Sequence, residues 1–497
     1  MAAPLSRTNG RMAMQLKALL CADAVLARGD PDTMITGITA DSREVKPGFL
    51  FAALAGAKAD GARFIADAMA RGAVVVLGRA GVEAPGSVAV VHSAEPRRVL
   101  ALMAARFHPG QPETAVAVTG TSGKTSVAEF TRQLFAACGR QAASLGTIGL
   151  VKPDGGVYGS LTTPDPVTLH RTLAGLAREG ITHLAFEASS HGLDQHRLDG
   201  VMLRAAGFTN LGRDHLDYHP TMEAYLEAKL RLFRDLLPVG APAIINADDA
   251  YSQPVIDAAK AAGRDVRTVG RGGTFLALHA LERDGFDQVL DIAHAGKRWR
   301  VRLPLIGDYQ ASNALVAAGM AIATGEAPDT VLPALEGLKG VKGRLEIAGR
   351  VRGGLIVIDY AHKPEALDAA LRAVKAFSGG RVVCVFGCGG DRDKGKRPIM
   401  GEIARRHATT VIITDDNPRS EDPAAIRAAI INGAREVRDI GDRAEAIKAG
   451  IRMLGARDVL LIAGKGHETG QIVGSTVIPF SDHDAVAAAL AEKPLDV

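Results

Sequence analysis

The sequence predicts an α/β protein with parallel sheets, and three observations support this fold class. A β-branched run at 114–119 precedes a glycine-rich turn and an amphipathic segment that ends near Gly139, which gives the order strand, turn and helix. From about residue 345 onward, strand-like runs alternate with helical segments, and this alternation is typical of a parallel sheet. The chain has 497 residues, and at roughly 100–200 residues per domain this length fits about three domains.

The composition is that of a globular protein whose partners are small molecules. Hydrophobic residues make up 47% and charged residues 23% of the chain, as in ordinary folded domains. The net charge is +4, but the basic residues are scattered and form no dense run with interleaved aromatic residues, which argues against nucleic acid as a partner. A mild positive excess suits a small polyanionic substrate.

The cysteines and the apolar runs indicate the compartment. Cys21, Cys138, Cys384 and Cys388 form no CxxC pair, so we expect free thiols in a reducing cytosol. No apolar run reaches the roughly 18 residues of a membrane span. The N-terminus is predicted to be an irregular tail followed by a first helix, not a signal peptide. The sequence therefore predicts a cytoplasmic protein that does not contact the membrane.

Two stretches are candidate joints between domains. Residues 106–114, RFHPGQPET, have the proline and glycine content of a link, and a second joint is expected near 337–346, GLKGVKGRLE. Before the first joint, short strands and helices are mixed. We therefore expect domains at 1–110, 111–343 and 344–497.

The stretch 116–130, VAVTGTSGKTSVAEF, resembles a phosphate-binding loop with one mismatch. Gly123, Lys124 and Thr125 match the end of the pattern G-x-x-x-x-G-K-[ST], but Val118 stands where the first glycine belongs. A strand, a glycine turn and a helix together expose backbone N–H groups at a helix N-terminus, where anions bind. Lys124 would reach the outer phosphates of a nucleotide, and the Thr125 hydroxyl would reach magnesium. The alternative is an ordinary glycine-rich turn.

Acidic and histidine residues follow in the next two hundred residues or so. Glu187 ends a strand-like run beside the phosphate loop, where a carboxylate is well placed to hold magnesium; an exposed acid is the alternative. His191, His196, His215 and His219 are close in sequence, but their spacings do not match the patterns of zinc sites.

A predicted helix at 222–237, MEAYLEAKLRLFRDLL, carries Lys229 among apolar and acidic neighbours. From these residues alone, we expect a solvated lysine on a helix surface.

Four strand-like runs in the last third of the chain each end in an unusual polar loop. The units are LIVIDYAHKP, RVVCVFGCGGDRDKGKRP, TTVIITDDNPRSEDP and DVLLIAGKGHETG, and helical segments such as EALDAALRAVKAF separate them. In open α/β sheets, ligands bind at the carboxyl ends of the strands. We therefore expect the four loops to lie on one rim and to face a ligand; solvated connections are the alternative.

Taken in order, nine motifs resemble those of the Mur ligase family. They are TGTSGKTS, EASSHGL, TNLGRDHLDYH, GDYQASNALVAAG, GRLE, DYAHKP, GCGGDRDKGKRP, DDNPR and AGKGHE, and the resemblance runs from DSR at 41–43 to GKGHE at 464–468. The phosphate loop of this family has the form G-x-x-G-K-T, which accounts for Val118. One departure is Gly212, where many relatives have serine, and we assign no role to this position.

The resemblance implies three domains: one for a UDP-sugar, a central P-loop ATPase and a C-terminal Rossmann-like domain for the amino acid. It also implies that ATP phosphorylates a substrate carboxylate to an acyl phosphate, which an amine then attacks. A carboxylate is a poor electrophile with a poor leaving group, and phosphorylation changes both. Catalysis then consists mostly of positioning and charge neutralisation.

By similarity, Lys124, Lys229 and His215 are expected to be catalytic. Lys229 matches the family lysine that carbon dioxide converts to a carbamate, and a lysine must be neutral to react in this way. Two magnesium ions are implied, with Thr125, Glu187, His215 and the Lys229 carbamate as ligands. The positions that match ATP contacts are Gly120, Thr121, Ser122, Gly123, Lys124, Thr125, Asn313, Arg344 and Asp359.

Ten further positions match contacts of the family with the UDP-N-acetylmuramoyl-dipeptide. At three of them, in a loop with variable side chains, only backbone contacts carry over, and these are Ala57, Lys58 and Ala59. The other seven are Ala40, Ser42, Thr162, Thr163, Ser189, Gln195 and Arg197.

The loop DDNPR bears on which amino acid is added. Members of the family add either meso-diaminopimelate or L-lysine, and the diaminopimelate branch has D-N-P-R here. Arg419 would grip bidentately the carboxylate that lysine lacks, and a bare lysine ammonium would leave this arginine unpaired. Glu468 would accept the distal ammonium. The matching positions are Arg392, Asp416, Asn417, Pro418, Arg419, Gly464 and Glu468.

The resemblance thus predicts an ATP-dependent meso-diaminopimelate ligase of peptidoglycan precursor synthesis, acting as a monomer on small molecules. An L-lysine-adding Mur ligase and a folylpolyglutamate synthase are alternatives. DSR, TTPD and HGLDQHR favour the UDP-sugar substrate over a folate. A third alternative is a regulatory or scaffold protein that binds a nucleotide, which would need no second substrate site.

Overall fold

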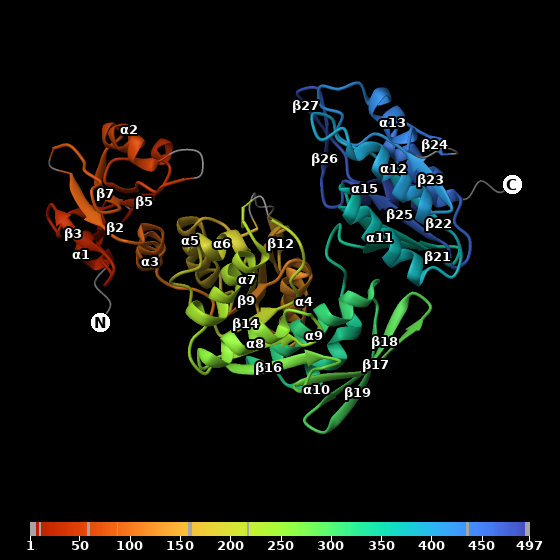
Figure 1. The fold of residues 1–497 in the computed structure, drawn as a ribbon, viewed down its shortest axis with the longest axis horizontal. Helices are drawn as coiled ribbons and strands as arrows, with labels where there is room; N and C mark the ends of the chain where they lie inside the picture. Colours follow the sequence, from red (N-terminus) through yellow and green to blue (C-terminus); the bar gives the residue numbers. More distant parts are fainter. Residues whose placement is uncertain are drawn as a thin grey trace. The chain divides into compact units, whose positions relative to one another are not determined.

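Parallel sheets covered by helices form most of the structure, which confirms the α/β class (Figure 1). The computed structural model describes residues 6–8, 11–56, 60–86, 88–157, 162–215, 218–433 and 437–492. These residues divide into two units, one of 1–268 with 319–326 and one of 269–318 with 327–497. This division does not coincide with the three domains expected from the sequence, whose boundaries stay a prediction.

A five-stranded sheet begins the first unit, in the order β3-β8-β7-β6-β5. Four of its strands are parallel, and β3 is antiparallel at one edge. Pro96 starts α3 at a position where no N–H is needed, and Val99, Met103 and Phe107 are buried at helical spacing. The elements are β1 (Ser6–Thr8), β2 (Arg11–Gln15), α1 (Leu16–Leu19), β3 (Val25–Arg28), β4 (Met34–Ile35), β5 (Gly37–Thr39), η1 (Ser42–Glu44), β6 (Phe49–Ala52), η2 (Gly61–Phe64), α2 (Ile65–Ala70), β7 (Ala73–Gly78), β8 (Ala89–His92) and α3 (Pro96–Phe107).

The predicted strand at 114–119 is β9, an inner strand of a second sheet, most of whose strands lie in the first unit. β13 and β14 pair in parallel with its two sides, so that Glu187 lies opposite Val118 and Phe208 lies opposite Thr119. The carboxyl ends of three strands therefore meet at the phosphate loop. The elements are β9 (Thr114–Thr119), α4 (Lys124–Ala137), β10 (Ala142–Gly146), β11 (Gly149–Lys152), β12 (Gly155–Val157), α5 (Pro166–Arg178), β13 (His183–Glu187), α6 (Ser190–Asp194), β14 (Ala205–Phe208), α7 (Met222–Arg231), the π-helical turn η3 (Leu232–Leu236), β15 (Pro242–Asn246), α8 (Ser252–Ala261) and β16 (Asp265–Gly270).

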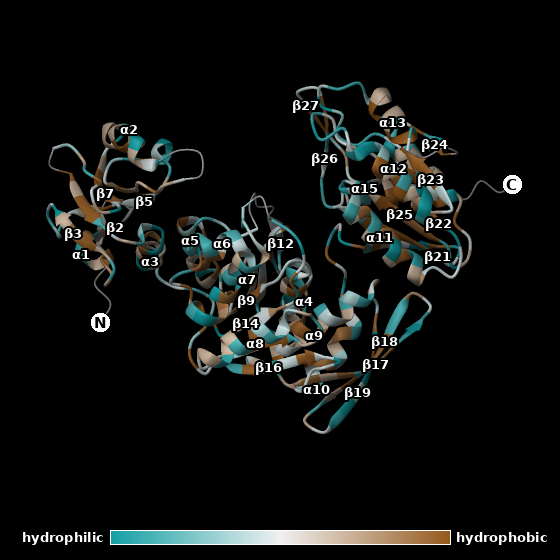
Figure 2. Cartoon of the chain, in the orientation of Figure 1, coloured by the Kyte–Doolittle hydropathy of each residue, from teal (hydrophilic) through white to brown (hydrophobic). Residues whose placement is uncertain are grey.

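The second unit contains the four predicted strand-and-loop units. Their strands are β21, β22, β23 and β25, which are parallel and adjacent in a sheet of order β20-β21-β25-β22-β23-β24, so the four loops share one edge as expected. Figure 2 shows these strands as apolar and the ribbon β17–β19 as more polar. The elements are β17 (Leu276–Asp284), β18 (Asp287–His294), β19 (Lys297–Leu303), α9 (Asp308–Ala323, which ends in the first unit), α10 (Pro328–Ala334), η4 (Leu335–Gly337), β20 (Glu346–Val351), β21 (Gly354–Asp359), α11 (Pro364–Phe377), β22 (Val382–Phe386), α12 (Lys396–His407), β23 (Thr410–Ile413), α13 (Pro423–Ile431), β24 (Arg438–Asp439), α14 (Arg443–Arg452), β25 (Val459–Ala463), β26 (Gly470–Val473), β27 (Thr476–Pro479) and α15 (Asp482–Ala491).

Two further findings concern the apolar segments and the cysteines in the described part of the chain. Among the described helices, none combines the length and the apolar character that crossing a bilayer requires. The four cysteines are free thiols, and Cys384 and Cys388 are buried in and after β22.

Candidate active site

Gly120 and Gly123 give the loop after β9 its shape. Gly120 has φ = 149°, and a Cβ atom there would lie 1.9 Å from the Thr209 hydroxyl oxygen, so a larger residue does not fit. Gly123 has φ = 85° and caps α4. Val118 lies inside β9, paired with a strand on each side. The loop begins only at Gly120, and this is why the missing first glycine of the general pattern leaves it intact.

The end of β14 holds this loop in place. The Thr209 hydroxyl donates to the carbonyl of Ser122 at 2.7 Å, and Ser122 N–H donates to Asn210 Oδ1 at 3.0 Å. The Thr121 N–H donates to the Asn210 carbonyl at 2.8 Å. The segment that follows β14 therefore fixes the backbone of the phosphate loop by three hydrogen bonds.

Two lysine side chains converge on the carbonyl oxygen of Gly120. Lys124 Nζ donates to it at 2.8 Å and also to the Thr121 carbonyl at 2.7 Å. Lys229 Nζ donates to the same Gly120 oxygen at 2.8 Å. Two ammonium groups at one acceptor repel each other, so this arrangement favours one charged and one neutral lysine.

Lys229 is the deeply buried member of this pair. Its residue is 1% exposed, and Nζ lies 4.2 Å from the ring centroid of Tyr225. Burial, and next the charge of Lys124, hold the pKa of Lys229 well below its ordinary value, while Asp214 opposes the shift. The expectation of a solvated lysine is wrong, because the face of α7 that carries Lys229 packs on the phosphate loop.

Glu187 at the end of β13 is buried beside the same loop. It is 2% exposed, and its Oε1 accepts the Thr147 N–H at 2.7 Å. A Cβ atom on Gly146 would lie 2.1 Å from that oxygen, so glycine makes room for the carboxylate. The alternative of an exposed acid is wrong. A buried carboxylate near Thr125 in the first turn of α4 is an oxygen donor set that suits magnesium.

The ring of His215 lies near the ring of Tyr225. Its ring centroid is 6.1 Å from that of Tyr225 and 4.9 Å from that of His191, and its side chain is half-exposed with Asp214 3.5 Å away. Tyr225 thus contacts both Lys229 and His215, which brings two of the expected catalytic residues together. Within the described residues, no three His, Cys, Asp or Glu side chains form a metal-holding group.

Four of the residues expected to bind the UDP-sugar peptide lie around Glu187. The Thr163 hydroxyl donates to the Glu187 carbonyl at 2.8 Å and lies 3.0 Å from the Ser189 hydroxyl. Arg197 Nη1 donates to the Thr163 carbonyl at 2.6 Å. The Thr162 hydroxyl lies 3.0 Å from that of Thr147, which also bonds Glu187. This cluster is continuous with the phosphate loop through β13.

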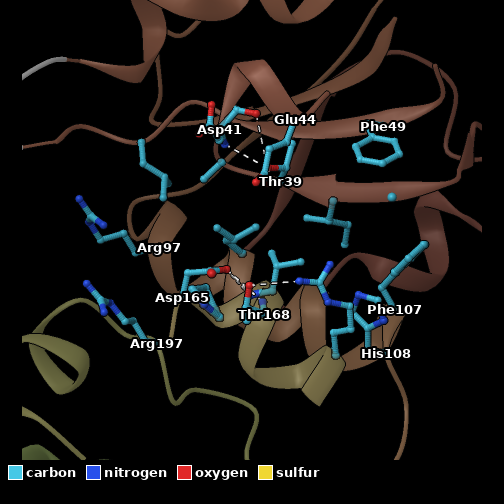
Figure 3. A pocket seen from close by; sticks show the side chains of 18 of the residues that line it. Thr39, Asp41, Glu44, Phe49, Arg97, Phe107, His108, Asp165, Thr168 and Arg197 are labelled. Atoms are coloured by element: carbon cyan, nitrogen blue, oxygen red, sulfur yellow. Dashed lines mark hydrogen bonds between the residues drawn. The ribbon is translucent and has the colours of Figure 1, made fainter. Parts of the chain in front are cut away.

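A cavity of about 800 Å³ in the first unit is lined by three of these expected residues, Ala40, Gln195 and, again, Arg197 (Figure 3). Arg97 also lines it and lies on the same side as Arg197 in Figure 3. Ser42 is buried in η1, directly after the lining residues. Ala57, Lys58 and Ala59 lie outside the described residues.

The remaining expected ATP residues lie in the second unit. Asp359 ends β21, and its two carboxylate oxygens accept the N–H groups of Leu345 at 2.7 Å and Ala361 at 2.8 Å. The guanidinium of Arg344 lies 5.3 Å from the ring centroid of Tyr360. Asn313 is buried in α9 and donates to Gln310 Oε1 at 2.9 Å. Arg344 and Asp359 are thus brought together.

Arg419 lies in the loop after β23, and its guanidinium group contacts backbone oxygens. Its Nη1 donates to the carbonyl of Gly390 at 2.8 Å. In the part of the chain that the structure describes, Arg419 forms no ion pair with a carboxylate. The hairpin β26–β27 fixes its backbone, since Arg419 N–H donates to Ile472 at 3.0 Å and its carbonyl accepts from Gly474 at 2.7 Å. A guanidinium held in this way is available to a carboxylate ligand.

Arg392 reaches the same rim from the loop after β22. The Asp391 carboxylate beside it accepts the Ser420 hydroxyl at 2.6 Å, and the Asp391 N–H donates to Glu421 at 2.7 Å. A Cβ atom on Gly390 would lie 1.9 Å from the Pro418 carbonyl. The loops of Arg392 and of Pro418 are therefore packed against each other, as expected.

Lys465 links the remaining amino-acid residues in one network. It is fully buried, and its Nζ donates to Asn417 Oδ1 at 3.1 Å and to Glu468 Oε2 at 3.3 Å. Asp416 Oδ1 lies 3.6 Å away, and Asn417 Nδ2 donates to Glu468 at 3.0 Å. Gly464 has φ = 115°, and a Cβ atom there would lie 2.7 Å from Asp416 Oδ2. Glu468 remains one-third exposed at the rim.

Comparison with known proteins identifies the family. Family models match three stretches: "Mur ligase family, catalytic domain" at 34–108, "Mur ligase middle domain" at 118–321 and "Mur ligase, glutamate ligase domain" at 343–466. A relative from Bradyrhizobium diazoefficiens is 59% identical over 97% of this chain and 100% of its own length. The chain belongs to the Mur ligase family. That relative is named UDP-N-acetylmuramoyl-L-alanyl-D-glutamate–2,6-diaminopimelate ligase.

Solved structures support the fold of this Mur ligase. One structure of a UDP-N-acetylmuramoyl-L-alanyl-D-glutamate–2,6-diaminopimelate ligase is 32% identical, has a TM-score of 0.74, and covers 96% of this chain and 99% of its own. A Mycobacterium tuberculosis folylpolyglutamate synthase is 18% identical with a TM-score of 0.56 and covers 72% of this chain and 89% of its own. The second likeness shows a common fold and no more.

Sequence reasoning missed several residues that organise the site of this Mur ligase. Asn210, Thr147 and Lys465 have no assigned role in the sequence, although Asn210 and Lys465 stand inside quoted motifs. Tyr225 precedes Lys229 by one helical turn, and residues at i and i+4 share a helix face, so this spacing was a usable signal. Thr147 stands in no motif, and nothing local marks it.

Proposed function

We propose that this chain joins meso-diaminopimelate to UDP-N-acetylmuramoyl-L-alanyl-D-glutamate at the expense of ATP, in peptidoglycan precursor synthesis. The observation that carries the proposal is the placement of Arg419 and Glu468 on one rim of the second unit. A guanidinium and a carboxylate there match the carboxylate and ammonium of a second amino-acid head. The name of the 59% identical relative supports the same substrate pair.

ATP is expected to bind with its phosphates on the loop from Gly120 to Thr125. Backbone N–H groups at the start of α4 and the charge of Lys124 would stabilise them. The γ-phosphoryl group passes to the carboxylate of the UDP-sugar dipeptide, forming an acyl phosphate and ADP. The amine of diaminopimelate then forms the amide bond, and phosphate leaves with the carboxylate oxygen it received. Asn313, Arg344 and Asp359 are proposed to contact the rest of the nucleotide.

Magnesium and a carbamate on Lys229 belong to the same proposal. Thr125, Glu187 and His215 would hold two magnesium ions together with the modified Lys229, and magnesium neutralises phosphate charge when bound. The lowered pKa of Lys229 supports this proposal because it favours the neutral amine, and a neutral amine adds to the carbon of carbon dioxide and loses a proton. The product is an anion beside the charge of Lys124.

The UDP-sugar is proposed to occupy the cavity in the first unit. Ala40, Gln195 and Arg197 line it, and contacts of the UDP-sugar with Ser42, Ala57, Lys58 and Ala59 belong to the same proposal by similarity. Arg97 and Arg197 on one side offer positive charge to a diphosphate. Thr162, Thr163 and Ser189 are proposed to carry the peptide end toward the phosphate loop.

The domain boundaries 110/111 and 343/344, a monomeric state and a cytoplasmic location complete the proposal. ATP and a UDP-sugar are cytoplasmic metabolites, which supports the location. Size-exclusion chromatography with light scattering tests the monomer: a mass near 51.9 kDa supports it, and twice that value overturns it.

The proposal is tested by phosphate release with UDP-N-acetylmuramoyl-L-alanyl-D-glutamate, ATP and magnesium, adding meso-diaminopimelate or L-lysine in parallel. Release is expected with meso-diaminopimelate alone. Arg419→Ala is expected to lose about tenfold to a hundredfold in kcat/KM, the range for a lost charge-assisted hydrogen bond. Arg372→Ala, an exposed arginine of α11, serves as the matched control and is expected to match the wild type.

Each other outcome points to one alternative. Equal or faster release with L-lysine would make the protein an L-lysine-adding ligase and refute the role given to Arg419. Release with neither amino acid would overturn the substrate pair, and folate substrates with glutamate would be the next to try.

A further inference from the structure

A fully buried ion pair lies beneath the amino-acid rim of the second unit. Arg443 begins α14 and Asp482 begins α15, and neither side chain is exposed. Arg443 Nε donates to Asp482 Oδ1 at 2.7 Å, and Nη2 donates to Oδ2 at 2.8 Å. This bidentate geometry fixes the plane of the guanidinium.

The guanidinium also contacts the turn that carries the amino-acid residues. Arg443 Nη2 donates to the carbonyl of Ala463, the last residue of β25, at 3.0 Å. The next residue is Gly464, where a Cβ atom would lie 2.7 Å from Asp416 Oδ2. Arg443 Nη1 is buried and has no hydrogen-bond partner in the described part of the chain. The positive charge of Arg443 and the carboxylate of Asp416 thus meet around one turn.

The charges in this cluster do not balance by themselves. Arg443 and Lys465 carry two positive charges, and Asp416, Asp482 and Glu468 carry three negative ones. Glu468 is the exposed member, so the residual negative charge lies at the rim. Burial raises the pKa of Asp416. Among the charges that oppose this rise, that of Arg443 has the largest effect.

We propose that Arg443, oriented by Asp482, is a positioning residue for the amino-acid site. It neutralises Asp416 from beneath the Gly464 turn, so that Lys465 stays shared between Asn417 and Glu468. Without Arg443, Lys465, whose Nζ lies 3.6 Å from Asp416 Oδ1, is drawn toward Asp416 and away from Asn417 and Glu468. The carboxylate of Glu468 would then lose its orientation toward a distal ammonium group. This inference rests on the proposed function, because it assigns Glu468 to the amino-acid substrate.

The test is the KM for each of the three substrates in Arg443→Met, Arg443→Lys and Arg381→Met. Arg381 is the control, because this half-exposed arginine donates from Nε and Nη2 to Oδ2 of the buried Asp458 at the amino ends of β22 and β25, the opposite edge of the same sheet. Arg443→Met is expected to raise the KM for meso-diaminopimelate about tenfold to a hundredfold, as when a charge-assisted hydrogen bond is lost. The KM values for ATP and the UDP-sugar dipeptide stay unchanged. Arg443→Lys, which keeps a buried cation, recovers most of the loss.

The outcomes separate this proposal from the proposed function. If the wild type turns over meso-diaminopimelate and Arg443→Met changes its KM no more than Arg381→Met does, Arg443 is structural and the proposal is overturned alone. If the wild type does not turn over meso-diaminopimelate, the proposed function fails and takes this inference with it. If Arg443→Met does not fold, Asp482→Asn replaces it: a raised KM for meso-diaminopimelate supports the positioning role, and an unchanged KM with lowered stability refutes it.

Discussion

Two lysines are almost completely buried among the residues that the structure of this Mur ligase describes, Lys229 in the first unit and Lys465 in the second. Lys229 meets a carbonyl oxygen, an aromatic ring and the charge of Lys124. Lys465 meets Asp416, Glu468 and the amide of Asn417. Burial is the same in the two sites, but the partners differ in charge.

The difference shows that neighbours decide what a buried lysine does. Desolvation and the charge of a second lysine outweigh the opposing charge of Asp214 and lower the pKa of Lys229, which favours the neutral amine, the form that reacts as a nucleophile. Two carboxylates within 4 Å instead make Lys465 a structural cation. The two sites therefore predict opposite results for the same substitution.

Lys229→Met is expected to have the largest effect, and on turnover. We expect kcat to fall about a thousandfold, or about 4 kcal/mol, as for the loss of a group that stabilises developing charge. Stability is expected to be unchanged or higher, because a desolvated amine is replaced by an apolar side chain of similar length. Phosphate release and urea unfolding measure the two effects.

A second measurement shows whether the loss comes from the carbamate. With ¹³C-labelled bicarbonate, a carbamate signal is expected in the wild type and absent in Lys229→Met. An inactive variant together with a wild type that gives no such signal would contradict the carbamate and leave Lys229 a different role.

Lys465→Met is expected to act on stability first. It removes the ammonium group that lies 3.6 Å from the buried Asp416 carboxylate, and removing one partner of a buried ion pair costs roughly 3 kcal/mol or more. Urea unfolding checks this, with Lys375→Met on the exposed face of α11 as the control. A stable Lys465→Met variant would show that the network around Asn417 does not depend on the charge.

The stability deficit of Lys465→Met is expected to depend on pH. Burial raises the pKa of Asp416 in the folded chain above its ordinary value of 3.8. At a pH between the ordinary pKa and the raised pKa, the folded chain therefore binds more protons than the unfolded chain. Stability falls as pH rises through this range. Removing Lys465 raises this pKa further. The deficit relative to the wild type should therefore shrink as pH falls toward the ordinary value and grow toward neutral pH. A deficit that is constant over this range would mean that Asp416 keeps its charge without Lys465.

The sequence could predict features formed by contiguous residues, but not the contacts between segments that are distant in the chain. The phosphate loop from Gly120 to Thr125 was predictable because strand, turn and helix are contiguous, and the four rim loops were predictable because each follows a strand of one parallel sheet. The environment of Lys229 was not, because its acceptor at Gly120 lies 109 residues away. Glu187 likewise became a buried carboxylate through Thr147, and such contacts leave no local pattern.

Tyr225→Phe is expected to have the smallest effect on activity. This substitution tests which contact of Tyr225 favours the neutral form of Lys229. The ring stays below Nζ, and only the hydrogen bond between the tyrosine oxygen and the Thr121 hydroxyl at 3.2 Å is lost. Such a bond contributes about 1 kcal/mol, so kcat/KM should fall roughly fivefold and the carbamate signal should remain. Tyr225→Leu removes the ring and opens space beside Lys229, so water can solvate the amine and the charged form gains. Tyr225→Leu is expected to lose the carbamate signal. If Tyr225→Phe loses it as well, the position of the phosphate loop, which is held through Thr121, controls the protonation of Lys229 more than the apolar ring does.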